Sequence, residues 1–117
     1  MHISNKSVNP SLDKEIRRSF FQLIADTKEP DEARQIFSAV FTPTEVEIFS
    51  KRLAIGYYLK SKRSYENIIN NLKVSSTTVA KVTEMMKNEG FGLALKKIGA
   101  DEWAEKWSRN IKKLISK

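Results

Sequence analysis

Hydrophobic residues recur at three- and four-residue spacing along most of the chain, and this spacing predicts a succession of helices rather than strands. The clearest case lies between residues 64 and 88, where a tight turn separates two short amphipathic segments. Their apolar positions are Ile68, Ile69 and Leu72 in the first segment and Val79, Val82 and Met86 in the second. Each segment has one face to bury, so the pair predicts a helix-turn-helix over residues 64–88.

Serine residues mark the expected start of each helix in this motif. Ser64 and Ser75 precede the two apolar segments, and a serine hydroxyl can accept a hydrogen bond from a free N–H group of the first helical turn. The turn between the helices falls at residues 73–74. Near the end of the first helix, Asn70 or Asn71 is expected to adopt the left-handed conformation that ends many helices.

The chain before the motif predicts three further helices. The first starts at a Ser11 cap. The second starts at Pro30 and the third at Pro43, after a Thr42 cap, because proline fits the first helical turn. The third helix is expected to run to about residue 60 and to be central, since apolar residues cover two of its sides. Gly56 lies within it, where it either allows a close helix contact or is a tolerated weak position.

The first of these helices carries an apolar stripe that needs a partner surface. The stripe consists of Ile16, Phe20, Phe21, Leu23 and Ile24. Two adjacent phenylalanines on a short helix can pack either within the monomer or across a dimer, and the pattern alone leaves both open.

Both ends of the chain differ from the helical middle. Residues 1–10 are polar, carry no periodicity and are expected to form a disordered lead-in. Residues 88–90 are expected to end the second motif helix, and a short apolar patch interrupted by glycines follows them. Residues 99–117 predict a basic amphipathic helix with Trp103 and Trp107 on its apolar side. Such a helix can lie on a membrane or on nucleic acid, and more often docks on its own protein.

The composition narrows the chemistry. The chain has 117 residues, the size of a single domain, with no cysteine and one histidine, His2. Disulfides and thiolate metal sites are therefore excluded, and no metal-ligand spacing, nucleophile motif or phosphate-binding glycine loop is present. We thus expect no enzyme, no catalytic residue, no metal and no cofactor. No apolar run could span a bilayer and no signal peptide opens the chain, so the expected location is the cytoplasm.

Positive charge is concentrated in the half of the chain that contains the motif. The net charge is +7. Residues 1–58 carry eight basic and eight acidic side chains, whereas residues 59–117 carry thirteen basic and six acidic ones. This asymmetry favours a polyanion on one side of the protein and protein contacts on the other, although a solvated lysine-rich surface has the same composition.

The polar face of the second motif helix suits a DNA major groove, because its side chains are small, hydroxylated or basic. The residues expected to hold phosphates are Lys60, Lys62, Arg63, Ser64, Ser75 and Lys87. Those expected to face base edges are Ser76, Thr77, Thr78, Ala80 and Lys81. Glu84 either accepts a hydrogen bond from a cytosine amine or points to solvent. The sequence therefore predicts double-stranded DNA as the partner.

The order of these features resembles the Trp repressor superfamily, and in particular its bacterial YerC/YecD-type branch. The resemblance covers roughly residues 15–98 and includes the threonine-proline opening at residues 42–43, the Arg52-Leu53 pair and the SSTTVAKV segment from Ser75. It implies an all-α domain of about six to seven helices over residues 11–98. In such domains two chains intertwine as a homodimer, and two helix-turn-helix heads read the half-sites of an operator. The implied function is transcriptional regulation, with repression as the expected mode.

The resemblance also implies a ligand site with altered residues. The positions that match ligand-contacting residues of Trp repressor are Thr42, Arg52, Thr78 and Lys81. Lys81 stands in place of a stacking arginine, Val82 in place of a glycine that leaves room for an indole ring, and Met85 in place of a serine. The pocket is thus expected to be altered or closed, Arg52 to be structural, and tryptophan not to act as co-repressor. The motif is then expected to bind DNA either without a ligand or with a different small-molecule effector, for which the sequence gives no support.

The turn of the motif is a further departure from the family pattern. Lys73 stands where the family commonly has glycine, which predicts either backbone strain or a shifted turn.

A protein-interaction module on a helix-turn-helix scaffold is the alternative function, because fold does not fix function and the tryptophan helix could dock a partner. RNA binding lacks support, since the aromatic residues lie on apolar helix faces rather than on an exposed stacking platform.

Overall fold

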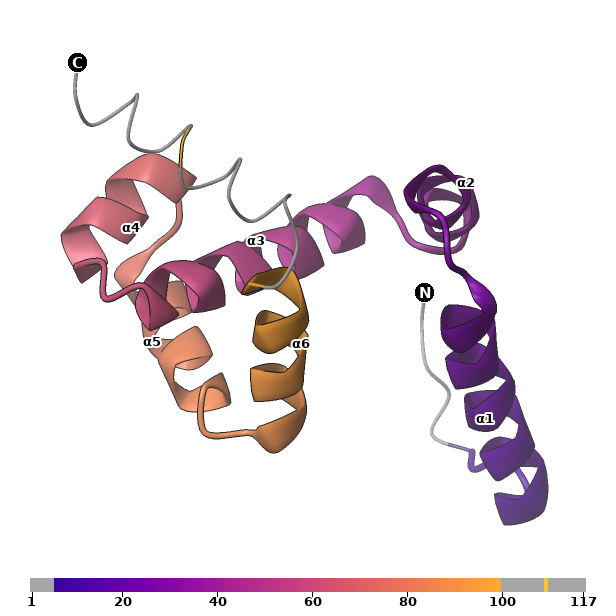
Figure 1. The fold of residues 1–117 in the computed structure, drawn as a ribbon. Coiled ribbons are helices and arrows are strands. Elements are labelled where there is room, and N and C mark those ends of the chain that lie inside the picture. The colour runs from indigo at the N-terminus through magenta and orange to yellow at the C-terminus, as the bar shows by residue number, and fades with distance from the viewer. Residues whose placement is uncertain (1–5, 100–108, 110–117) are drawn as a thin grey trace. The chain divides into compact units, whose positions relative to one another are not determined.

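The computed structural model describes residues 6–99 and Arg109, and this part of the chain contains helices and no strand. Its elements are α1 Pro10–Asp26, α2 Pro30–Val40, α3 Pro43–Lys60, α4 Tyr65–Leu72, α5 Ser76–Met85 and α6 Glu89–Gly99 (Figure 1). The predicted all-α fold is confirmed. The helix predicted over residues 99–117 lies outside the described residues apart from its first residue and Arg109, as do residues 1–5 of the lead-in.

The chain divides into two compact units, Met1–Pro43 and Thr44–Lys117. The first unit contains α1 and α2, and the second is built from α3 to α6. As predicted, α2 begins at Pro30, and two acidic residues in its first turn complement the positive end of the helix dipole. α3 begins at Pro43, also as predicted.

The start of α1 corrects the prediction of a cap at Ser11. The Asn9 side chain caps the helix by accepting hydrogen bonds from the backbone N–H groups of Ser11, at 2.9 Å, and Leu12, at 3.4 Å. The helix therefore begins at Pro10, two residues earlier than a cap at Ser11 predicts. Proline fits this first helical position because an N–H group there would have no partner within the helix.

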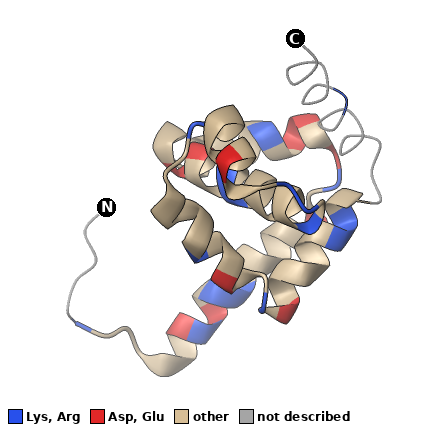
Figure 2. Ribbon diagram, turned by 90° about the vertical axis from the view of Figure 1, so that its left-hand side faces the viewer, with Lys and Arg blue, Asp and Glu red and all other residues tan. Residues whose placement is uncertain are grey.

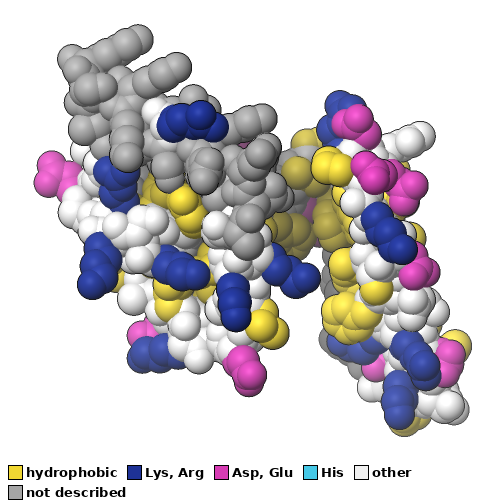
Figure 3. Space-filling model, viewed as in Figure 1, with side chains coloured by type: hydrophobic (Ala, Val, Ile, Leu, Met, Phe, Trp, Pro, Cys, Tyr) yellow, Lys and Arg dark blue, Asp and Glu magenta, His cyan; other side chains and the backbone are white. Residues whose placement is uncertain are grey.

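Phenylalanine rings join α1 to the end of α2. Phe20 meets Phe41 edge-on, with 6.3 Å between ring centroids, and Phe41 stacks on Phe37 at 5.8 Å. Even so, neither α1 nor α2 has a buried residue, and the exposed fractions of Phe21 and Ile16 reach 65% and 54%. Figure 3 shows hydrophobic side chains at the surface of these helices. The apolar stripe of α1 is thus not buried within the first unit.

The second unit has a buried core formed by α3, α4 and α5. Its buried side chains are Ile55, Tyr58, Ile68, Val79 and Val82. Burial raises the pKa of the Tyr58 phenol above its ordinary value, and the charge of Arg63 opposes this shift. The buried residues of α3 all lie in its C-terminal half, whereas Ile48 and Phe49 in the other half are exposed. The prediction that α3 is central is therefore correct for the C-terminal half only.

Gly56 allows α6 to approach α3 closely. A Cβ atom at this position would lie 2.6 Å from Cε1 of Phe91 and 3.2 Å from Cδ1 of Leu95. Of the two alternatives for Gly56, the close contact is confirmed. α6 itself corrects the prediction of an interrupted patch, because it is one continuous helix that contains Gly90 and Gly92. Burial of Leu95 against α3 stabilises this helix despite the weak helix propensity of glycine.

Two residues with side chains adopt the left-handed conformation in the described part of the chain, and both are lysines at helix ends. Lys62, with a φ of 62°, follows α3, and the next N–H group, that of Arg63, donates to the Tyr58 carbonyl at 3.0 Å. Lys73, with φ 56° and ψ 51°, ends α4, and its N–H donates to the Ile69 carbonyl. Of the two alternatives for Lys73, the structure shows strain, since a left-handed residue with a Cβ atom costs about 1–2 kcal/mol.

The prediction that Asn70 or Asn71 takes the left-handed conformation is wrong. α4 continues through both residues to Leu72. The Asn71 side chain donates instead to the Asn67 carbonyl one turn earlier, at 2.9 Å, and this bond keeps Asn71 within the helix.

Candidate DNA-binding surface

Both helices of the motif begin where the sequence predicts. The Ser64 hydroxyl accepts a hydrogen bond from the Asn67 N–H, and the Ser75 hydroxyl accepts one from the Thr78 N–H, each at 3.1 Å. The hydroxyl oxygens of Ser75 and Thr78 also lie 2.9 Å apart, within hydrogen-bond distance. These caps satisfy N–H groups that have no partner within the helix, and they fix where α4 and α5 start.

α5 has one buried face and one exposed face. Val79 and Val82 point into the core, with exposed fractions of 0% and 2%. The residues expected to face base edges are all exposed, namely Ser76, Thr77, Thr78, Ala80 and Lys81. A helix that follows a tight turn and exposes small, hydroxylated and basic side chains can enter a major groove.

One contact between the two motif helices was not predicted. The Tyr65 hydroxyl at the start of α4 lies 2.7 Å from the Thr83 hydroxyl near the end of α5. Because Thr83 donates its own hydrogen to the Val79 carbonyl at 2.9 Å, Tyr65 is the donor. This bond helps to hold α5 at a fixed angle to α4. The sequence gives no local indication of it, since 18 residues separate the partners.

The residues expected to hold phosphates lie at helix ends and in the segments that connect the helices. Lys60, Lys62, Ser64, Ser75 and Lys87 are exposed, and Arg63 is half-buried. Figure 2 shows basic residues in the connecting segments as well as on the helices. Lys87 forms an ion pair with Glu84, with 3.2 Å between Nζ and Oε2, so Glu84 is partnered within its own segment. An exposed pair of this kind contributes little stability and can exchange for another anion.

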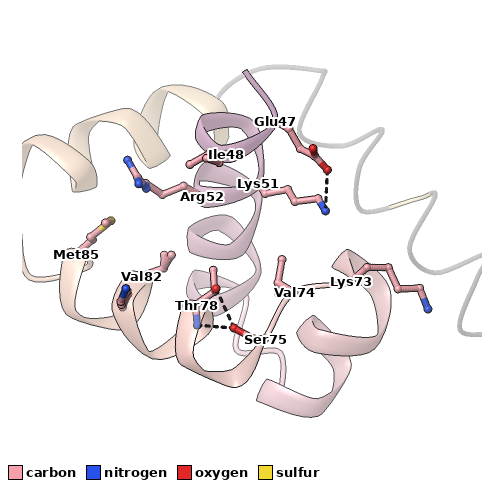
Figure 4. A pocket seen from close by; sticks show the side chains of 11 residues that line it. Glu47, Ile48, Lys51, Arg52, Lys73, Val74, Ser75, Thr78, Val82 and Met85 are labelled. Carbon is pink, nitrogen blue, oxygen red and sulfur yellow. Dashed lines mark hydrogen bonds and ion pairs between the residues drawn. The ribbon is translucent and has the colours of Figure 1, made fainter. Parts of the chain in front are cut away.

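A pocket of about 470 Å³ lies between α3 and the motif (Figure 4). It is lined by Glu47, Ile48, Lys51, Arg52, Lys73, Val74, Ser75, Thr78, Lys81, Val82 and Met85. Of the predicted ligand-contacting residues, the structure brings Arg52, Thr78 and Lys81 to this pocket, and Thr42 is not among its lining residues. All three of the altered residues, Lys81, Val82 and Met85, form part of the pocket wall.

Two of the cations in this pocket have partners on α3. Lys51 forms an ion pair with Glu47, with 3.2 Å between Nζ and Oε1. The Arg52 guanidinium lies over the Phe49 ring, 5.5 Å from its centroid, which is the geometry of a cation–π interaction. The structural role expected for Arg52 stays a prediction.

Comparison with known families decides how this surface is classified. The model of a family described as "Trp repressor protein" matches residues 16–98, which is most of the chain. The chain belongs to the Trp repressor family. Membership in this family indicates a helix-turn-helix DNA-binding regulator. Searches of curated proteins and of solved structures found no match.

Family membership leaves the YerC/YecD-type branch as a prediction. None of the described helices is long and apolar enough to cross a membrane. No group of three or more His, Cys, Asp or Glu side chains in the described residues could hold a metal ion. The tryptophans of the alternative function, Trp103 and Trp107, lie outside the described residues.

Proposed function

We propose that the protein binds double-stranded DNA in a sequence-specific manner as a homodimer in the cytoplasm, and that it represses transcription. The observation that carries this proposal is the exposed polar face of α5, which is held outward by the burial of Val79 and Val82 on the opposite face. Thr77, Ala80 and Lys81 contact base edges in this proposal, and the basic residues around α4 hold phosphates.

Homodimer formation would cover the apolar stripe of α1. The stripe includes Phe21, 65% exposed, and Ile16, 54% exposed. Monomeric proteins rarely expose contiguous apolar side chains in this number, and an amphipathic helix becomes stable when its apolar face is buried. A twofold dimer places two motifs on half-sites about one turn of DNA, 34–36 Å, apart.

The proposed binding to DNA needs no tryptophan. Lys81 lacks the planar guanidinium that stacks on an aromatic ring, and the Val82 side chain occupies part of the pocket wall. Adding tryptophan should therefore leave the DNA affinity unchanged in a fluorescence anisotropy titration. An increase in affinity of tenfold or more would contradict this part of the proposal.

Selection from a random duplex library, followed by size-exclusion chromatography of the selected complex, tests the proposal. The expected result is one enriched motif with two half-sites, bound by two copies of the chain. No enrichment at low salt would contradict DNA binding, and one copy on a single half-site would contradict the dimer.

Two variants then separate base contacts from phosphate contacts. Lys81→Ala should weaken binding to the selected site by about 1–3 kcal/mol and relax the preference at one base pair. Lys60→Ala, at the end of α3, should weaken binding to all duplexes alike. If Lys81→Ala leaves the selected sequence and its affinity unchanged, α5 is not the helix that reads bases.

A further inference from the structure

The two left-handed lysines occupy positions that usually favour glycine. Glycine is common after a helix end because it has no Cβ atom to clash in the left-handed conformation. After α3, the hydrogen bonds from Lys62 N–H to the Leu59 carbonyl and from Arg63 N–H to the Tyr58 carbonyl, both 3.0 Å, form the helix end at which glycine is most frequent. Lys73 ends α4 in the same conformation. Both positions thus carry a strained residue with a long cationic side chain.

Neither lysine has an ionic partner among the described residues. Lys62 and Lys73 are exposed, and neither forms an ion pair with any residue that the structure describes. Lys51 and Lys87, by contrast, each pair with a glutamate. Although Lys73 lines the pocket, its side chain extends away from the other labelled pocket residues (Figure 4). Among the described residues, no ion pair of the two ammonium groups offsets the strain at these positions.

The two lysines flank a helix whose length is close to the width of the DNA major groove. They flank α4, whose eight residues span about 12 Å at 1.5 Å per residue. The major groove of B-DNA is also about 12 Å wide, and the first helix of a helix-turn-helix crosses the DNA backbone while the second enters the groove. A lysine at each end of α4 can thus reach phosphates that border the groove occupied by α5.

We propose that Lys62 and Lys73 bind DNA phosphates from the two ends of α4, and that glycine at either position gives a more stable protein with a lower affinity for DNA. This inference rests on the proposed function. It adds Lys73 to the DNA contacts and accounts for two left-handed residues that local packing leaves unexplained.

The test compares Lys62→Gly, Lys73→Gly and the double variant with the wild-type chain. Each glycine removes both the charge and the strain. Lys73→Asn removes the charge but keeps a residue that tolerates the left-handed conformation, and Lys96→Gln is the matched control, because it removes one exposed charge from the last turn of α6. Thermal melts measure stability, and anisotropy titrations against duplex DNA at several salt concentrations measure affinity and its salt dependence.

We expect each glycine variant to melt a few degrees higher than the wild type. The slope of the logarithm of the DNA association constant against the logarithm of salt concentration should become shallower by about 0.9 for each lysine removed per DNA-bound head. Lys73→Asn should have the same slope as Lys73→Gly, and Lys96→Gln the same slope as the wild type. Steeper or unchanged slopes in the glycine variants would overturn the phosphate contacts, and unchanged or lower melting temperatures would overturn the claim about stability. If the wild-type chain binds no duplex at low salt, the proposed function fails together with this inference.

Discussion

The two units of this chain use similar apolar patterns with opposite results. In the second unit, residues of three helices converge on a core in which Ile55, Ile68 and Val79 are completely buried. In the first unit, α1 and α2 have patterns of the same kind but no buried residue, and the α1 stripe stays exposed. Hydrophobic periodicity therefore shows which face of a helix needs burial, but not whether the same chain supplies the covering surface. Four sets of substitutions test this difference between the units, and they are given in order of decreasing expected effect.

The largest effect is expected from a charge placed in the exposed stripe. Phe21→Glu should raise the dissociation constant of the dimer more than 100-fold, because two copies each lose about 1.5–3 kcal/mol of apolar burial. Sedimentation equilibrium measures this constant. Arg18→Gln, at an exposed position of the same helix outside the stripe, should leave it unchanged. If the wild-type chain sediments as a monomer at all concentrations, a second copy of the chain does not cover the α1 stripe.

The same substitution in both units tests the contrast directly. Ile55→Ala should lower the free energy of unfolding by about 2–5 kcal/mol at any protein concentration, since Ile55 is fully buried within its own chain. Ile16→Ala should have an effect that grows with protein concentration, because Ile16 is 54% exposed until a partner covers it. Urea denaturation at two protein concentrations distinguishes these behaviours. A concentration-independent loss for Ile16→Ala would place its packing within the monomer.

A smaller effect is expected where α6 meets α3. Gly56→Ala should destabilise the second unit by about 1–2 kcal/mol, because its Cβ would lie 2.6 Å from the Phe91 ring and the overpacking exceeds the gain in helix propensity. Gly92→Ala is the control, since nothing lies within 4 Å of a Cβ there, and it should stabilise α6 by about 0.5–1 kcal/mol. Thermal melts compare the two. Equal effects of the two substitutions would mean that the close approach at Gly56 is absent in solution.

The smallest effect concerns the cap of α5. Ser75→Ala removes the acceptor for the Thr78 N–H and should destabilise the second unit by about 1 kcal/mol, as seen by urea denaturation. Ser76→Ala, one position later, removes an exposed hydroxyl that caps nothing in α5 and should change stability by less than about 0.5 kcal/mol. The reverse order of effects would show that the helix starts elsewhere.

The sequence predicted those parts of the fold that depend on neighbouring residues. The starts of α2, α4 and α5 follow from Pro30, Ser64 and Ser75, because a cap or an initial proline acts within one turn of the helix. The sequence did not show which of two nearby residues caps a helix. Asn9 and Ser11 are both good caps, and the choice depends on which one proline follows.

Contacts between residues far apart in the sequence could not be predicted from the spacing of apolar residues. The Tyr65–Thr83 hydrogen bond and the burial of α6 on Gly56 depend on how helices pack, which spacing along one helix does not report. The left-handed lysine at residue 73 was visible only as a departure from the expected glycine. The family resemblance indicated Arg52, Thr78 and Lys81 at the pocket, whereas Glu47, Ile48 and Lys51 became known as lining residues only from the packing of α3 against the motif.

The separation of faces on α5 has a consequence for how this protein can change over evolutionary time. Its inward residues, Val79 and Val82, belong to the core, whereas Thr77, Ala80 and Lys81 are exposed. Substitutions at these outward positions should therefore leave the fold almost unaltered while they change which bases are preferred. A duplicated copy of the gene could acquire a new set of target sites in a few steps, without first gaining stability elsewhere.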